Sequence, residues 1–277
     1  MSDYIRVYID ADEVKQEVLL AMLHEIGFEG FEQNESQLIA FIPKNQFNEE
    51  ELTKILIQVL STKNFKSEVV ENQNWNALWE SNFEPITIGN DCYVKALFHP
   101  ERPGFKFTIT IQPKMSFGTG HHSTTQLVME QMLKMNLAGK SVLDMGCGTG
   151  VLAILAEMMG ATRVLAIDND EWAYINSIEN VAQNFCRHTQ VMHGDQNLLG
   201  GEKFDVILSN ITRNANLENF AVYQKVIVPH GILICSGFME EDIDQLAKSA
   251  SINNFTMVES VLKNTWATIV FKSSKQN

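Results

Sequence analysis

The chain has 277 residues and a formal net charge of −13, from 21 basic and 34 acidic side chains. This length allows two domains and a sizeable core, and the acidic balance argues against a protein that binds a nucleic-acid backbone by counterion release. No run of about 18 apolar residues predicts a membrane span, and the segment after Met1 lacks the basic start and apolar stretch of a signal peptide. We therefore expect a cytoplasmic protein, and its four cysteines, which lack metal-ligand spacing, fit reduced thiols.

Residues 1–72 predict a small α+β domain. The apolar periodicity predicts strands near 4–10, 29–32, 37–42 and 65–70, with helices at about 13–26 and 48–60, the second capped by Asn48. The order βαββαβ is typical of a ferredoxin-like sandwich. This segment carries 14 acidic and six basic side chains. Its net charge of −8 could attract a basic protein or could only keep the surface solvated.

Residues 73–90 predict a structured linker. Trp75, Leu78, Trp79 and Phe83 recur at helical intervals. These aromatic side chains could contact substrate or pack between the domains. After the linker, alternating segments at 91–97 and 105–111 predict a hairpin.

Residues 91–277 predict a second, larger α/β domain. After a helix that ends near Met135, strands and helices alternate: strands are expected at 141–145, 163–168, 189–193, 204–209 and 231–236, helices at 150–159, 170–184, 214–227 and 239–250, and two last strands near 254–261 and 265–272. Alternation of this kind predicts a mainly parallel sheet with helices on both faces. Ligands bind such sheets at the carboxyl ends of the strands.

A glycine-rich loop follows the first strand of this sheet. Gly146, Gly148 and Gly150 alternate two residues after Asp144, and the next strand ends in Asp168. The dinucleotide-binding fingerprint requires a different glycine spacing. An acidic residue at the end of the second strand can accept both hydroxyls of a ribose. The pattern predicts a site for S-adenosylmethionine, with the two aspartates and three glycines as cofactor-binding residues; the alternative is a tight turn that binds nothing.

Two further strands also end in polar residues. Asp195 follows the third strand and could accept a hydrogen bond from the adenine amino group or cap the next turn. Asn210 and Ile211 follow the fourth strand, and we predict that the Asn210 side chain and the Ile211 carbonyl orient an incoming amine as catalytic groups. The alternative for Asn210 is a helix cap.

A second glycine-rich loop precedes the helix that ends near Met135, and we expect it to close over the cofactor. Its members are Phe117, Gly118, Thr119 and Gly120, followed by His121 and His122. The paired histidines have no third ligand at metal spacing nearby, so we expect no metal site.

Together, these motifs resemble the bacterial ribosomal protein L11 methyltransferase family over essentially the whole chain. The resemblance rests on Trp75-Asn76, Trp79, the two glycine-rich loops with Thr124-Thr125, Ile167-Asp168 and Asn210-Ile211. It implies a ferredoxin-like substrate-recognition domain joined to a Rossmann-like, seven-strand, mostly parallel methyltransferase domain. By the same resemblance, Thr125, Gly146, Asp168 and Asn210 contact S-adenosylmethionine, and residues 117–120 close over it.

The resemblance also implies the substrate, a basic large-subunit ribosomal protein of the stalk base. We expect a monomer that methylates lysine side chains, the N-terminal α-amine, or both, without contacting nucleic acid. An α-amine has a pKa of about 7.7–8.0 and a lysine one of about 10.4, so a lysine must first lose its proton. Two other interpretations stay open: a small-molecule N- or O-methyltransferase with an accessory lid domain, and a non-catalytic binding module on a methyltransferase fold.

Overall fold

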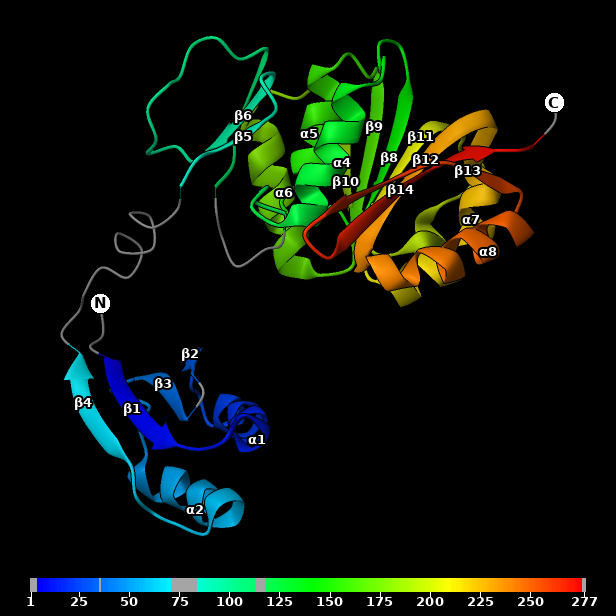
Figure 1. Ribbon diagram of the computed structural model, residues 1–277. Helices are drawn as coiled ribbons and strands as arrows, with labels where there is room; N and C mark the ends of the chain where they lie inside the picture. Colours follow the sequence, from blue (N-terminus) through cyan, green and yellow to red (C-terminus); the bar gives the residue numbers. More distant parts are fainter. Residues whose placement is uncertain (1–3, 35, 71–83, 113–117, 276–277) are drawn as a thin grey trace. The chain divides into compact units, whose positions relative to one another are not determined.

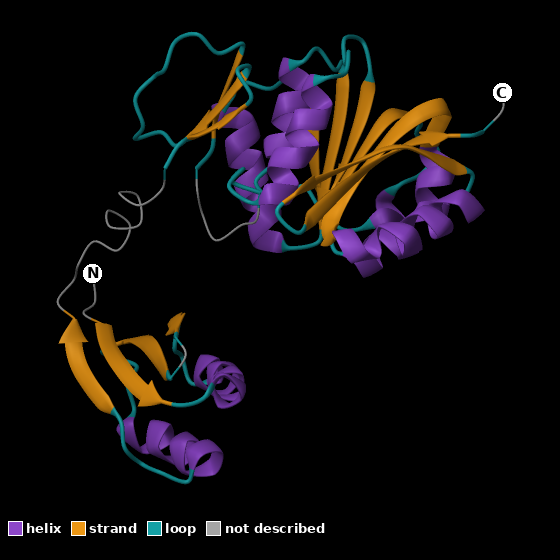
Figure 2. Cartoon of the chain, in the orientation of Figure 1, coloured by secondary structure: helices purple, strands orange, loops and turns teal. Residues whose placement is uncertain are grey.

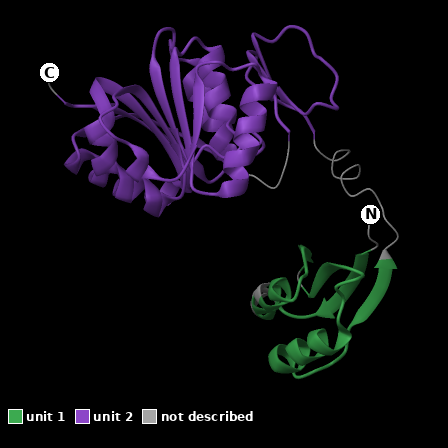
Figure 3. Cartoon of the chain, turned by 180° about the vertical axis from the view of Figure 1, so that it is seen from behind, with its two compact units in different colours: residues 1–82 green, residues 83–277 purple. Residues whose placement is uncertain are grey.

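The computed structural model describes residues 4–34, 36–70, 84–112 and 118–275, and the chain divides into two compact units, Met1–Asn82 and Phe83–Asn277 (Figure 3). The predicted linker helix, through Trp75, Leu78, Trp79 and Phe83, lies outside the described residues. In the described stretches, no helix combines the length and the apolar character needed to cross a bilayer.

Unit 1 contains the six elements that its periodicity predicts. They are β1 (Tyr4–Asp10), α1 (Glu13–Glu25), β2 (Gly30–Gln33), β3 (Gln37–Pro43), α2 (Glu49–Leu60) and β4 (Lys66–Val70). The strands form an antiparallel sheet in the order β2-β3-β1-β4. The Asn48 side chain accepts hydrogen bonds from the amides of Glu50 and Glu51, which confirms the predicted helix cap.

Strand alternation gives this sheet two different faces. Val7 and Ile9 of β1 are fully buried against leucines of both helices, Leu19, Leu23, Leu52 and Leu56. Tyr4, Arg6 and Tyr8 alternate with them and lie on the other face of the sheet, because successive side chains of a strand point to opposite sides. The two helices cover only the first of these faces (Figure 1).

Unit 2 is built on a seven-stranded sheet in the order β10-β9-β8-β11-β12-β14-β13, parallel except where β14 runs antiparallel to both neighbours. The strands are β8 (Ser141–Met145), β9 (Arg163–Asp168), β10 (Thr189–His193), β11 (Phe204–Asn210), β12 (Ile227–Met239), β13 (Phe255–Lys263) and β14 (Trp266–Ser273). The helices are α4 (Ser123–Leu133), α5 (Val151–Met158), α6 (Glu171–Gln183), α7 (Arg213–Val226) and α8 (Ile243–Ile252), with 3-10 turns η1 (Gln196–Leu198) and η2 (Glu240–Asp242). The predicted alternation and mainly parallel sheet are confirmed.

Two apolar layers cover the faces of this sheet (Figure 2). Val142 and Val164 pack with residues of α4, α5 and α6 in one buried cluster. Their neighbours Leu143 and Leu165 pack with α7 and α8 in the other. Because both faces are buried, these strands read as continuous apolar runs rather than as alternating ones.

The predicted hairpin at 91–97 and 105–111 is wrong. The strands β6 (Cys92–Lys95) and β7 (Phe107–Thr110) pair in parallel, and the antiparallel partner of β6 is β5 (Ile86–Ile88). Parallel neighbours need a connection that returns the chain to the starting end of the first strand. Residues 96–106 provide it as a broad loop (Figure 1).

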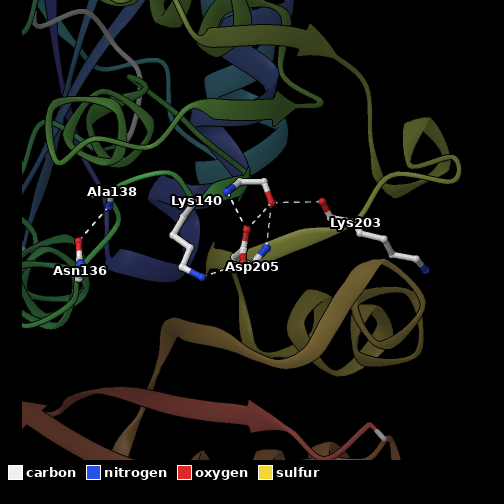
Figure 4. Close-up of polar contacts among 6 residues, drawn as sticks. Asn136, Ala138, Lys140, Lys203 and Asp205 are labelled. Carbon is white, nitrogen blue, oxygen red and sulfur yellow. Dashed lines mark hydrogen bonds and ion pairs between the residues drawn. The ribbon is translucent and has the colours of Figure 1, made fainter. Parts of the chain in front are cut away.

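A polar clamp joins the amino ends of β8 and β11, at the edge of the sheet opposite the strand ends predicted to bind ligand (Figure 4). The Asp205 carboxylate accepts hydrogen bonds from the backbone amide and hydroxyl of Ser141 at 2.9 and 2.8 Å, and pairs with Lys140 Nζ at 3.0 Å. Burial alone would raise the pKa of Asp205, but these bonds outweigh it and lower that pKa. The clamp therefore fixes how the two strands begin.

Candidate functional site

A cavity of about 660 Å³ opens at the carboxyl ends of the parallel strands. It brings together six of the predicted site residues: Gly146, Gly148, Asp168, Asp195, Asn210 and Ile211. The described lining also includes residues that were not predicted as site residues: His122, Thr124, Met145, Ile167, Asn169, Asp170, Ala173, Gly194, Gln196, Thr212, Ala215, Asn219, Gly237 and Trp266. Three of the described lining residues are aspartates and none is Lys or Arg, so the cavity suits hydroxyls and cations better than phosphates.

The glycine loop holds its three glycines in the left-handed region, with φ values of +72° for Gly146, +54° for Gly148 and +79° for Gly150. A Cβ on Gly146 would overlap the side chain of Ile211, which follows the neighbouring strand β11. The amides of Gly146 and Cys147 both donate to the carbonyl of Ile167, at 2.8 and 3.1 Å. The loop is thereby tied to β9 and kept thin enough to admit Ile211.

Asp168 ends β9 and is 8% exposed. One carboxylate oxygen accepts from the Gly148 amide at 2.8 Å, and the other accepts from the Asp170 amide at 3.0 Å. A carboxylate oxygen has two lone pairs, so each keeps one for a further donor. These two bonds fix the orientation of the Asp168 carboxylate at the edge of the cavity.

Asp144 lies outside the cavity lining, behind the glycine loop. It is fully buried, and one of its oxygens accepts from the Ala153 amide at 3.1 Å. The other oxygen has no hydrogen-bond partner among the described residues. Burial, with a smaller contribution from the charge of Asp168, raises the pKa of Asp144 to about 7. Any influence of Asp144 on a ligand therefore acts through charge and through α5.

Asn210 ends β11 and is 9% exposed. Its amide nitrogen donates to the hydroxyl of Thr125, itself fully buried on α4, at 3.2 Å. Its carbonyl oxygen, Oδ1, is buried and has no partner in the described part of the chain. The cap of α7 is Thr212, which accepts from the Ala215 amide, so the helix-cap alternative for Asn210 is wrong.

A buried polar network fixes the turn after Asn210. The Asn216 side chain, 0% exposed, donates to the carbonyls of Ile211 and Ser236, each at 3.0 Å. Its own oxygen accepts from Ser209, which also contacts the Tyr223 hydroxyl at 2.8 Å. The predicted acceptor, the Ile211 carbonyl, therefore already accepts one hydrogen bond and keeps one lone pair.

Gly237 lets β12 approach this turn. Its φ is +93°, and a Cβ there would overlap the backbone of Ile211. Gly237 lies at a bulge between Ser236 and Phe238, where the register of β12 against β14 shifts. The sequence analysis missed it; a glycine closing an apolar strand was the available indication.

The second glycine loop is described from Gly118 onward, and Phe117 lies outside the described residues. The Gly118 carbonyl accepts from the Thr149 hydroxyl at 2.6 Å, so this loop is bonded directly to the first one. Gly120 lies against Ile86, where a Cβ would clash. Thr119 contacts His121, and the other ring nitrogen of His121 lies 2.8 Å from the Glu84 carbonyl.

Asp195 caps the next turn, as one of its two predicted roles required, while its contact with adenine stays a prediction. It lines the cavity, and its carboxylate accepts from the Asn197 amide at 2.8 Å as the cap of η1. Asn219 of α7 also lines the cavity, with a buried amide oxygen that has no partner among the described residues.

The fold and this site define a class, the Rossmann-like methyltransferases. A crystal structure of ribosomal protein L11 methylase from Lactobacillus delbrueckii subsp. bulgaricus superimposes with a TM-score of 0.64, at 23% identity, over 70% of this chain and 99% of that one. A methyltransferase structure from Pyrococcus furiosus gives a TM-score of 0.51, at 16% identity, over 60% and 89%. These likenesses establish the fold.

The sequence comparisons establish the family. The family model of ribosomal protein L11 methyltransferase (PrmA) matches residues 4–274. Over 264 residues, proteins of that name from Porphyromonas gingivalis and Bacteroides fragilis are 44% and 42% identical, covering 94% of this chain and 91% and 94% of theirs. The chain belongs to the ribosomal protein L11 methyltransferase family, and it is an S-adenosylmethionine-dependent methyltransferase.

Proposed function

We propose that this protein transfers methyl groups from S-adenosylmethionine to amines of ribosomal protein L11, at lysine side chains, the N-terminal α-amine, or both. The substrate follows from the name that the relatives carry. The observation that carries the chemistry is the buried Asn210 Oδ1, an acceptor without a partner among the described residues, at the edge of the cavity. We further propose that the enzyme acts as a cytoplasmic monomer on the stalk-base protein.

The described residues fit the proposed cofactor. Asp168 has one lone pair left on each oxygen for the ribose hydroxyls, and Asp195 offers an acceptor for the adenine amino group. The thin backbone at Gly146 and Gly148 admits a ligand closely. Asp144 lies outside the cavity lining, and because its pKa is raised to about 7, only its deprotonated form would favour a cationic sulfonium.

When bound, S-adenosylmethionine supplies a methyl group already activated by its sulfonium. The residues of this chain must then orient a neutral amine and exclude water. Asn210 Oδ1 accepts one N–H of that amine, and the remaining lone pair of the Ile211 carbonyl accepts another. Such positioning supplies about 7–11 kcal/mol of a bimolecular barrier.

Intact-mass spectrometry of purified L11 tests the proposal. Incubation with the enzyme and S-adenosylmethionine is expected to raise the mass of L11 in steps of one methyl group. Asn210→Ala should slow these steps while circular dichroism shows an unchanged fold. An unaltered L11 mass with the wild-type enzyme contradicts the proposed function; an unchanged rate in the variant contradicts only the role of Asn210.

We also propose that residues 1–72 recognise the protein substrate, with residues 73–90 as the link to the methyltransferase domain of residues 91–277. The support is charge, because residues 1–72 carry a net −8. A chain lacking residues 1–72 should bind S-adenosylmethionine normally and fail to methylate L11. Normal methylation by that chain would contradict the recognition role.

A further inference from the structure

The face of the unit 1 sheet that α1 and α2 leave uncovered, here called the open face, has an unusual composition. Arg6 on β1 lies opposite Phe41 of β3 and opposite Glu68 of β4 in the strand register. Tyr4 and Tyr8 flank Arg6 on the same strand, so aromatic rings and charged groups share this face. A solvated sheet face needs no aromatic rings, so their presence calls for an explanation.

A hollow of about 360 Å³ lies at the β2 side of the open face. The rings of Tyr4 and Phe41 line it from the open face, and its carboxylates are Glu29 and Glu32. Phe31 also contributes to the lining, but it lies opposite Ala40 and its side chain packs against the helix-covered core. Gly30 completes the lining, and a Cβ there would touch the Phe41 ring at 3.4 Å. Rings together with carboxylates form a site that attracts a cation.

The groups of the hollow are held in place by neighbouring contacts. The Tyr4 hydroxyl donates to a Glu29 carboxylate oxygen at 2.7 Å, and this bond raises the pKa of Tyr4. The Arg6 guanidinium carbon lies 5.2 Å from the centroid of the Phe41 ring and pairs with Glu68 at 3.2 Å. Arg6 does not line the hollow and already occupies one face of the Phe41 ring, so a further cation has to contact the part of Phe41 that lines the hollow.

We propose that this hollow binds a basic side chain, lysine or arginine, of the ribosomal protein substrate, away from the residue being methylated. The inference rests on the proposed function and adds the place on unit 1 where the substrate docks. A protein that binds ribosomal RNA must present basic side chains. The hollow offers two carboxylates and the rings of Tyr4 and Phe41 to one of them, on a unit whose net charge is −8 over residues 1–72.

Paired charge-removal variants of the full-length enzyme test the proposal. Glu29→Gln/Glu32→Gln removes the two carboxylates of the hollow. Glu49→Gln/Glu50→Gln removes two charges from the exposed start of α2 and serves as the matched control. We expect the first pair to raise the KM for L11 by about tenfold, as loss of a cation site implies. The kcat and the affinity for S-adenosylmethionine should stay unchanged, and the control pair should shift KM by less than about twofold.

Substitutions of the Tyr4 ring distinguish binding in the hollow from a general effect of the negative charge of unit 1. Tyr4→Leu should also raise KM, whereas Tyr4→Phe, which keeps the ring and loses only the exposed hydrogen bond to Glu29, should raise it less. An unchanged KM in Glu29→Gln/Glu32→Gln, or an equal rise in the control pair, would overturn the proposal.

Calorimetric measurement of L11 binding distinguishes failure of the proposed function from failure of the proposed docking site. If the wild-type enzyme binds L11 without methylating it, the proposed function fails, and the variants then test the hollow by affinity alone. Methylation of L11 with equal affinity in every variant contradicts the hollow and leaves the proposed function standing.

Discussion

Asn216 provides the sharpest test of how the turn at Asn210 and Ile211 is held. Replacing Asn216 by alanine removes buried hydrogen bonds to the carbonyls of Ile211 and Ser236, each 3.0 Å long. Its third bond, to the Thr212 carbonyl, is partly redundant, because the Asn216 backbone amide donates to the same oxygen at 3.0 Å.

The cost follows from these contacts. A buried polar group that loses its partner costs about 1–3 kcal/mol, so the two carbonyls predict a loss of about 2–6 kcal/mol in the free energy of unfolding. Domains are stable by about 5–15 kcal/mol, so the variant should still fold at low temperature. Because the Ile211 carbonyl is no longer fixed, we expect kcat to fall while the KM for L11 changes little.

Urea unfolding and steady-state methylation of L11 measure both effects. Asn216→Asp is the informative companion, because it keeps the size and the acceptor for Ser209 but cannot donate two hydrogen bonds. It should be at least as damaging as Asn216→Ala. If either variant unfolds within about 0.5 kcal/mol of the wild type and keeps its kcat, the network does not position the site.

Three further predictions concern buried charge and close backbone approach. The pKa of Asp144 is about 7 in the folded state against an ordinary 3.8, so its contribution to stability is present at low pH and is lost as pH rises between these values, by about 4 kcal/mol. Asp144→Asn should lack this loss, and parallel curves of stability against pH for the two proteins would contradict the prediction. In thermal unfolding, Gly237→Ala should destabilise the protein by well over 1 kcal/mol, because the added Cβ meets the Ile211 backbone. Gly139→Ala is the control, also at positive φ but with open space around it, and should cost about 1 kcal/mol; equal costs for the two variants would be evidence against the clash. The pKa of Asp205 is lowered in the folded state, so the stability that this carboxylate contributes is present above pH 3.8 and is lost as pH falls below it. The free energy of unfolding of Asp205→Asn should therefore depend less on pH in acid than that of the wild type.

The elements of both units could be predicted from the sequence because their periodicity is local. The six elements of unit 1 and the alternation in unit 2 follow from apolar spacing and helix caps such as Asn48. The parallel pairing of β6 with β7 could not be predicted, because the alternation of apolar residues within a strand carries no information on the direction of the partner strand.

The residues of the candidate site also fall into some that could be predicted from the sequence and some that could not. Gly146 and Asp168 were recognisable because their roles depend on a short glycine spacing and on the end of the next strand. Asn216 and Gly237 were not, because their importance depends on how closely α7 and β12 approach Ile211. Asp144 shows the converse, since its motif position predicted a ligand contact and the fold places it behind the loop, outside the described cavity lining.

The central claim is that this cavity binds S-adenosylmethionine with its ribose on Asp168. The most direct test is a crystal structure of the protein with S-adenosylhomocysteine, the product of methyl transfer. We predict both ribose hydroxyls within about 3.2 Å of the Asp168 carboxylate, with the sulfur toward Asn210. Density for the nucleoside elsewhere, or a ribose that makes no contact with Asp168, would contradict the account.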